Sequence, residues 1–299
     1  MPSFRFRAVF TVLTLAAGSA LTAGDAVSAR REVISRADLR YPAPPARSED
    51  GLPVGNGRMG SLVWTTPGTL RLQINRNDVQ AINRDTNSFF ERHSDYTGGC
   101  GFVDVDLGLA SGAVFAPDGC PQHLAVYDGL LTLQGRDVTA RVIASPHHDI
   151  FALEIDDQRA QPQPLSVDLR MLRHLSQYFG DLERLVRERS ITVRTRHHTA
   201  TSRLHVHDDR IVLTQEFREG THVAKSALAA QIVGRPAQPH FANETIVRLT
   251  APAARGRVIV LLASAATLDA DEDVAAAALR ALDATASRTF ATLAAETAA

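Results

Sequence analysis

The residues best suited to chemistry in this sequence are carboxylates that stand close together in the chain. They form four pairs: Asp104 and Asp106, Asp156 and Asp157, Asp208 and Asp209, and Glu216 and Glu219. Glycoside hydrolases use two carboxylates about 5 to 10 Å apart, and residues two apart on a strand share one face. Adjacent acids, however, are far more often turn residues, and strand acids are usually solvated. We therefore expect no catalytic residue among these pairs.

Amide, guanidinium and aromatic side chains gather around a dense glycine turn, which reads GLPVGNGRMGSLVW over residues 51–64. Amides and guanidinium groups can hydrogen-bond to sugar hydroxyls or to a neighbouring domain, and a tryptophan can stack on a sugar ring. The residues expected to form this substrate or domain-interface site are Asn56, Arg58, Trp64, Gln73, Asn75, Asn77 and Asp78. The alternative is that the glycine turn only shapes a hairpin and docks a neighbouring domain.

Motifs for metals and cofactors are weak. The histidines at 147, 148, 197, 198, 205 and 207 have no supporting carboxylate spacing, so a solvent-facing polar strand is the better interpretation of His205 and His207. Residues 55–60 match G-x-G-x-x-G by letters but precede a strand, whereas the dinucleotide fingerprint opens a helix. We expect no metal and no cofactor.

A hairpin must position the polar residues of the turn. Glycines let the backbone adopt positive φ and approach a neighbour closely. The strand expected over residues 61–65 is followed by a Pro67-Gly68 turn and by a second strand over 69–75, in which Leu70, Leu72 and Ile74 alternate with polar residues. A polar cluster at 75–78 ends the unit.

This unit resembles the opening hairpin of the N-terminal β-sandwich of glycoside hydrolase family 95 and its uncharacterised relatives, where the pattern reads like P-L-G-N-G-R-L-G-A-M-V before a strand ending Q-L-N. The resemblance covers roughly residues 45 to 290. It implies a carbohydrate substrate for the parent enzyme, with α-L-fucosides or α-L-galactosides as candidates, and catalytic carboxylates in an (α/α)6 barrel that follows the sandwich.

The chain has 299 residues, whereas members of that family are much longer. We therefore expect the N-terminal part of a larger hydrolase, separated from its barrel by truncation, a frameshift or domain loss. The expected organisation is a signal peptide over 1–29, a β-sandwich over 30–270 and a helical linker over 271–299 toward the absent barrel.

The rest of the chain is rich in short alternating segments separated by turn residues. Strands are expected at 102–107, 124–133, 138–145, 150–155, 165–172, 190–195, 200–207, 210–217, 222–233, 241–249 and 257–263. Asp208 and Asp209 read as a tight turn between two of them. This pattern predicts a mostly β protein built as a large antiparallel sandwich, with a C-terminal linker helix.

Two segments depart from the β pattern. Residues 171–189 carry leucines and Tyr178 at helical spacing and could form a helical insertion. Residues 269–299 begin with three acids suited to a helix N-terminus and continue as an alanine-rich helix. Such a helix can link to a barrel or pack on the sandwich. Without the barrel we expect it to fray beside an exposed apolar patch.

Cys100 and Cys120 are the only cysteines. In an oxidising compartment they could form a disulfide that closes a loop of about 20 residues. Spacing alone does not fix the geometry, so the pairing stays open.

The N-terminus has the features of a secretory signal. Arg5 and Arg7 precede a short apolar run, and small residues then offer cleavage sites up to Ala29. The expected location is outside the cytoplasm, secreted or periplasmic, with no membrane segment in the mature form. Charged residues make up 22% of the chain and the net charge is −1, which gives no electrostatic signature for nucleic acid.

Three functions fit these observations. The first is a secreted accessory β-sandwich of an α-L-fucosidase-like glycoside hydrolase, inactive alone and partnered by the barrel. The second is a stand-alone carbohydrate-binding module, although aromatic residues make up only 6% of the chain. The third is a small complete glycosidase that uses sandwich carboxylates. We favour the first.

Overall fold

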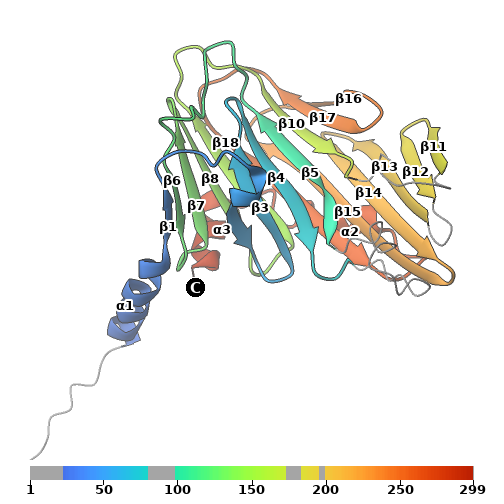
Figure 1. Ribbon diagram of the computed structural model, residues 1–299, viewed down its shortest axis with the longest axis horizontal. Helices are drawn as coiled ribbons and strands as arrows, with labels where there is room; N and C mark the ends of the chain where they lie inside the picture. The colour runs from blue at the N-terminus through green and yellow to red at the C-terminus, as the bar shows by residue number, and fades with distance from the viewer. Residues whose placement is uncertain (1–22, 80–97, 173–182, 195–198, 299) are drawn as a thin grey trace, which may run out of the picture.

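The computed structural model describes residues 23–79, 98–172, 183–194 and 199–298. Over these residues the strands form one antiparallel sheet of eleven strands and a second of seven, which face each other across a shared apolar core (Figure 1). The predicted fold, a mostly β protein with a large antiparallel sandwich, is confirmed.

The larger sheet contains, in spatial order, β1 (Leu39–Tyr41), β6 (Gln122–Ala125), β7 (Leu130–Gly135), β8 (Val138–Ala144), β9 (Ile150–Asp157), β18 (Gly256–Thr267), β15 (His222–Val233), β14 (Arg210–Glu219), β13 (Thr199–His207), β12 (Ser190–Arg194) and β11 (Glu183–Arg187). The smaller sheet contains β16 (Gln238–Phe241), β17 (Ile246–Ala251), β10 (Leu165–Arg170), β5 (Gly99–Asp106), β4 (Thr69–Arg76), β3 (Met59–Thr65) and β2 (Leu52–Gly55).

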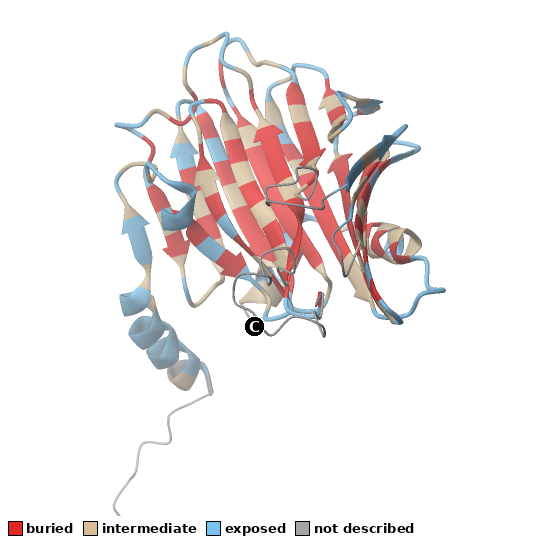
Figure 2. Cartoon of the chain, turned by 45° about the vertical axis from the view of Figure 1, so that its right-hand side comes forward, coloured by how far each residue is buried: buried red, intermediate tan, exposed pale blue. Residues whose placement is uncertain are grey.

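Period-two alternation explains the smaller sheet. In β4, Leu70, Leu72 and Ile74 are fully buried and the residues between them are half-buried. Alternate residues of a strand point to opposite faces, so the buried set faces the larger sheet and the polar set faces outward. Figure 2 shows the resulting rows of buried residues along the central strands.

The central strands of the larger sheet are apolar on both faces because helices cover the outer one. Helix α2 (Val274–Asp283) and helix α3 (Phe290–Thr297) bury Leu282, Phe290 and Leu293 against that face. Small residues there, such as Ala227 and Ala263, let a helix approach closely. Two helices thus bury their apolar sides on the sheet, and the expected fraying of the C-terminal helix stays a prediction.

The N-terminal part lies apart from the sandwich. Helix α1 (Ala23–Ile34) stands away from the sheets and leads through the short turn η1 (Ser35–Ala37) to β1 (Figure 1). Arg31 joins α1 to the body through an ion pair of 2.6 Å with Asp128. A second short turn, η2 (Ser48–Asp50), precedes β2. In the described residues, no helix is long and apolar enough to cross a membrane.

Several predicted elements differ in detail. The segment 124–133 is split by a turn into β6 and β7, and 241–249 is divided between β16 and β17. Residues 183–187, expected in a helical insertion, form β11 instead, because they pair with β12. The rest of that insertion, 173–182, lies outside the described residues. The tight turn at Asp208 and Asp209 is confirmed, with Asp208 at φ 53°.

The structure does not join Cys100 and Cys120 in a disulfide. Cys100 lies in β5, opposite Gln215 of β14, and Cys120 lies beside β7, whose Gln134 donates to Pro121. From β7 to β14 the larger sheet spans five strand spacings, about 24 Å, whereas a disulfide needs Cα atoms within about 7 Å. Burial raises the pKa of the Cys120 thiol to about 11.

Candidate functional site

A hollow of about 600 Å³ lies at the edge of the smaller sheet, where the glycine turn meets the ends of β2, β3 and β4. We call it the glycine hollow. It is lined by Pro53, Val54, Gly55, Gly57, Arg58, Met59, Gly60, Ser61, Leu62, Asn75, Arg76 and Asn77. Glycines and the partly exposed Leu62 give it an apolar surface beside the polar groups of Arg58, Asn75 and Asn77.

Two glycines are required by the backbone of this turn. Gly57 has φ +87°, a conformation that L-residues with side chains rarely adopt. At Gly55 a Cβ atom would lie 2.9 Å from the carbonyl oxygen of Met59. Larger residues at either position would distort the turn, so its shape follows directly from the glycine spacing.

Asn56 fixes the turn rather than lining the hollow. Its side-chain oxygen accepts hydrogen bonds from the backbone N–H groups of Arg58 and Met59, at 3.0 and 2.9 Å. Its amide nitrogen donates to the carbonyl oxygens of Ser145 and His148, at 2.8 and 3.3 Å. The side chain therefore ties the glycine turn to the β8–β9 loop, which belongs to the other sheet.

Arg76 and Asp149 reinforce this connection, and neither was predicted from the sequence. Only 2% of the Arg76 side chain is exposed. It donates to the carbonyl oxygen of Ser264 in β18 at 2.8 Å and pairs with Asp149 at 3.1 Å and with Asp78 at 2.7 Å. Arg58 contacts the same Asp149 carboxylate from the solvent side, at 3.2 Å. The floor of the hollow is thus held by charges from both sheets.

The pKa values of this cluster follow from burial and pairing. Burial alone would raise the pKa of Asp78, but the hydrogen bonds and charge of Arg76 more than offset it, so the pKa is lowered. Burial likewise opposes the charge of Arg76, yet Asp78 and Asp149 raise its pKa above the ordinary value. Both groups stay charged at neutral pH.

The structure brings three of the seven predicted site residues to the glycine hollow, namely Arg58, Asn75 and Asn77. The Asn77 amide also donates to the carbonyl of Gly57 at 2.8 Å, which steadies the turn. Gln73 lies next to Asn75 on the outer face, and their side-chain amides are 3.4 Å apart.

Trp64 and Asp78 lie outside the glycine hollow. Trp64 and Leu62 lie on the outer face of β3, and Trp64 is two residues further from the glycine turn. Trp64 is opposite Arg71 of β4. It therefore lies roughly 7 Å along the strand from the apolar lining of the hollow. Asp78 faces Arg76 and supports the turn instead of lining it.

The outer face of the smaller sheet also carries a ladder of charges. Asp104 of β5 is directly opposite Asp168 of β10. Arg170 binds Asp104 at 2.6 Å, and Arg248 binds both oxygens of Asp168, at 2.6 and 2.7 Å. Neighbouring carboxylates at such spacing suit glycoside hydrolysis. Here both carboxylates are bound by arginine side chains, and the side chains of Asp104 and Asp168 are only 12% and 8% exposed.

The other acidic pairs have structural partners as well. Asp106 accepts a hydrogen bond from the N–H of Gly108, and Asp157 forms a buried pair with Arg159 at 2.7 Å. Asp156 binds Arg257, and Glu216 binds Arg218. Asp208 and Asp209 form the turn described above.

The histidines do not converge. His148 follows β8 and contacts Arg288 at 3.0 Å, whereas His205 and His207 lie on β13. Residues 197–198 lie outside the described part. Among the described residues, no three His, Cys, Asp or Glu side chains are placed to hold a metal ion.

Comparison with known proteins finds solved structures that match this chain. A protein assigned as a kojibiose phosphorylase from the human microbiome aligns with 87% of this chain, at a TM-score of 0.49 and 10% sequence identity. The chain spans only 37% of the length of that structure. No family model matches the sequence, and no curated protein matches it.

Proposed function

We propose that this chain is the exported N-terminal β-sandwich of a family-95-like glycoside hydrolase, and that its glycine hollow contacts carbohydrate. In this role the sandwich assists an (α/α)6 barrel and carries no hydrolytic activity of its own. It contacts the substrate of the parent enzyme, for which an α-L-fucoside is the first candidate. The proposal combines the resemblance of the glycine unit with the geometry of the hollow.

The observation that carries the proposal is a rigid, open hollow with adjacent amide and guanidinium groups. Asn56 and Arg76 hold the turn from behind, so the hollow is formed before any ligand arrives. Arg58, 62% exposed, and Asn75 present donors and an acceptor beside the apolar side chain of Leu62. Sugars offer hydroxyl groups and apolar ring faces, which such a surface complements.

Inactivity of the sandwich alone is supported by the acids themselves. Asp104, the best placed carboxylate of the predicted pairs, is held by Arg170 and faces Arg71 at 3.5 Å. A small complete glycosidase would need two carboxylates open to substrate, whereas the Asp104 side chain is only 12% exposed and is bound by its arginine partners.

A stand-alone carbohydrate-binding module is favoured by one specific observation. Helices α2 and α3 bury their apolar sides on the larger sheet, which gives the sandwich its own cover there. The two proposals share the glycine hollow and differ in whether a barrel is needed.

The test is carbohydrate binding measured by titration calorimetry with fucose-containing oligosaccharides. The variant Arg58→Ala with Asn75→Ala should weaken binding about a hundredfold, at about 1.4 kcal/mol for each lost group. The matched control is Arg257→Ala with Gln238→Ala, which removes an exposed arginine and an exposed amide far from the hollow and should change nothing. Equal losses in both variants, or no binding by the unaltered chain, would contradict the proposal.

Hydrolysis is tested separately with aryl glycosides. The purified chain should show no turnover. Robust turnover that Asp104→Asn abolishes would instead identify a complete small glycosidase.

Export is also a proposal. The predicted cleavage near Ala29 falls within α1, outside both sheets, so removal of residues 1–29 leaves the sandwich core in place. N-terminal sequencing of protein recovered outside the cytoplasm should begin near residue 30. Material that still begins at Met1 would count against export by this signal.

A further inference from the structure

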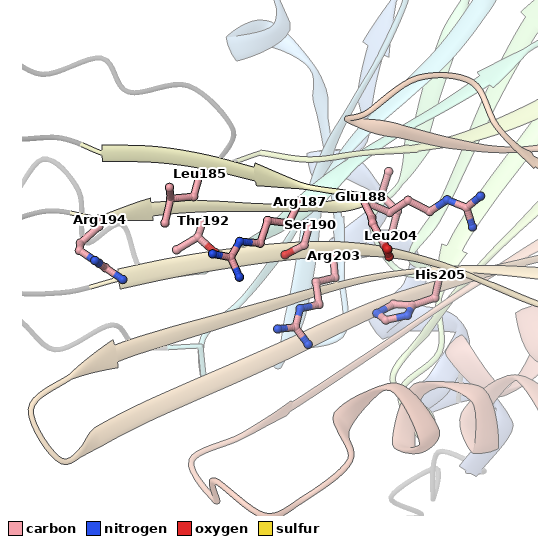
Figure 3. A pocket seen from close by; sticks show the side chains of 10 residues that line it. Leu185, Arg187, Glu188, Ser190, Thr192, Arg194, Arg203, Leu204 and His205 are labelled. Atoms are coloured by element: carbon pink, nitrogen blue, oxygen red, sulfur yellow. The ribbon is translucent and has the colours of Figure 1, made fainter.

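A second hollow lies on the other sheet, on the outer face of β11, β12 and β13, with a volume of about 580 Å³ (Figure 3). Its lining includes Arg187, Ser190, Thr192, Arg194, Arg203 and His205. It is separate from the glycine hollow, so what it binds does not depend on the function proposed above. We call it the basic hollow.

Strand pairing places its central residues in one row. Arg187 of β11 is opposite Ser190 of β12, and Ser190 is opposite Arg203 of β13. The two arginines are therefore two strand spacings apart, about 10 Å, with the hydroxyl group of Ser190 between them. Thr192 lies on the same face in the next row. The guanidinium groups of the two long side chains can therefore both bind one oxyanion, or each can bind one of two neighbouring oxyanions.

Arg187 and Arg203 differ in their partners from other arginines of the described part of the chain. In the part of the chain that the structure describes, neither Arg187 nor Arg203 is paired with a carboxylate, whereas Arg194 binds Glu183 at 3.2 Å and Arg218 binds Glu216. Of the described residues that line the hollow, Glu188 is the one acid, against four arginines. The basic hollow therefore carries an excess of positive charge in a chain whose net charge is −1.

The hollow continues toward helix α2. A smaller one, of about 240 Å³, shares Arg203 and His205 with it and extends across β14 and β15 to Lys225, but Glu216, Glu272 and Asp273 line it as well. The excess of positive charge is therefore confined to the basic hollow, where two arginines about 10 Å apart can hold successive anionic groups of a polymer.

We propose that the basic hollow binds the sulfate or carboxylate groups of an acidic polysaccharide, with Arg187 and Arg203 as the principal contacts. Guanidinium groups bind planar or multi-oxygen anions through paired hydrogen bonds, and the serine and threonine hydroxyl groups can add to them. Single-stranded nucleic acid is disfavoured because it is held largely by stacking on aromatic side chains, and none of the described residues that line either hollow is aromatic.

The experiment compares dextran sulfate with neutral dextran of the same length, by titration calorimetry on the full chain at 0.15 M salt. Polygalacturonate tests carboxylates as the anion, and oligo(dT) tests nucleic acid. Dextran sulfate or polygalacturonate should bind and neutral dextran should not. Failure of both anionic glycans to bind, or tighter binding of oligo(dT), would overturn the proposal.

Variants then locate the site. Arg187→Ala with Arg203→Ala should weaken binding about a hundredfold, tenfold for each charged hydrogen-bonding group lost. Arg40→Ala with Arg257→Ala removes the same charge from side chains that are 68% and 69% exposed, and should have little effect. An equal loss in the control pair would show nonspecific attraction and overturn the site. If the alanine variant unfolds, the double lysine variant, which keeps charge but loses paired hydrogen bonds, should still bind more weakly than the unaltered chain.

Discussion

Arg76 of β4 donates a hydrogen bond of 2.8 Å to the carbonyl oxygen of Ser264 in β18, a residue 188 positions further along the chain. The two strands belong to different sheets. Arg76 continues the buried series of β4 beyond Leu72 and Ile74, at the end of the strand where the sandwich opens to the glycine turn. A single charged side chain therefore closes one end of the apolar core and supports the glycine hollow at the same time.

Removal of this side chain should destabilise the fold. Arg76→Ala removes the hydrogen bond to the carbonyl of Ser264 and the buried ion pair with Asp149, and should lower the free energy of unfolding by about 3 kcal/mol. Arg58→Ala is the matched control, because Arg58 contacts the same Asp149 from solvent and should cost less than about 1 kcal/mol. Urea denaturation measures both. Similar losses for the two variants would show that Arg76 does not join the sheets.

Stability should also depend on pH through Asp78. Its pKa is lowered in the folded chain, since Arg76 outweighs the effect of burial. Such a carboxylate stabilises the fold above its unfolded pKa of about 3.9, and this contribution disappears as the pH falls through the folded value. The advantage of the unaltered chain over Asp78→Asn should therefore be present at pH 7 and shrink below about pH 4. An advantage that stays constant down to pH 2 would contradict this assignment.

How far the sequence predicts this site depends on the kind of interaction. The glycine spacing and the alternation of residues 69–75 were enough to place Arg58, Asn75 and Asn77 together, because these contacts are local to one hairpin. Asp149 could not be found this way, since its position depends on the packing of two sheets. Arg76 did leave a signal: a charged residue at an inward-facing position of an alternating strand requires a buried partner.

The same reasoning explains the errors in the fold. Long strands with clear alternation were identified, whereas the short edge strands β1, β2 and β16 offer too few residues for a period to emerge. In β11, leucine and valine among arginines also fit a helical spacing, and only the pairing with β12 decides the conformation. Whether Cys100 and Cys120 pair could not be decided from the sequence, because distance along the chain says nothing about which strands separate two cysteines.

His205 offers a probe of the basic hollow. Its pKa lies below the ordinary value of 6.5, because surrounding protein disfavours the charged ring and Arg203 repels it, while Asp273 acts in the opposite direction. NMR titration of the ring should show a higher pKa in Arg203→Gln and a lower one in Asp273→Asn, which retains a capping side chain for α2. Because the folded chain favours the neutral ring, protonation of His205 opposes folding. The free energy of unfolding should therefore decrease as the pH falls through 6.5. Shifts of the same sign in both variants would contradict the placement of the two charges.

Helix α2 tests whether the sandwich is self-sufficient. Its buried residues Ala278 and Leu282 are fully covered by the outer face of the larger sheet, and Asp273 caps its N-terminus by accepting a hydrogen bond of 3.0 Å from Ala276. Most helical stability in proteins comes from such packing, so amides of α2 should exchange with solvent about as slowly as those of β10 and β18.

Leu282→Ala should remove that protection and lower the free energy of unfolding by about 2 to 5 kcal/mol. The control is Leu268→Ala, because Leu268 is 61% exposed and its loss should lower the free energy of unfolding by less than about 0.5 kcal/mol. Protection in a monodisperse monomer would show that the sheet alone holds α2, which both the accessory role and the stand-alone module allow. Rapid exchange throughout α2 would mean that the contact with the sheet is too weak to hold the helix. In that case a partner surface is needed, and the accessory role is the better description.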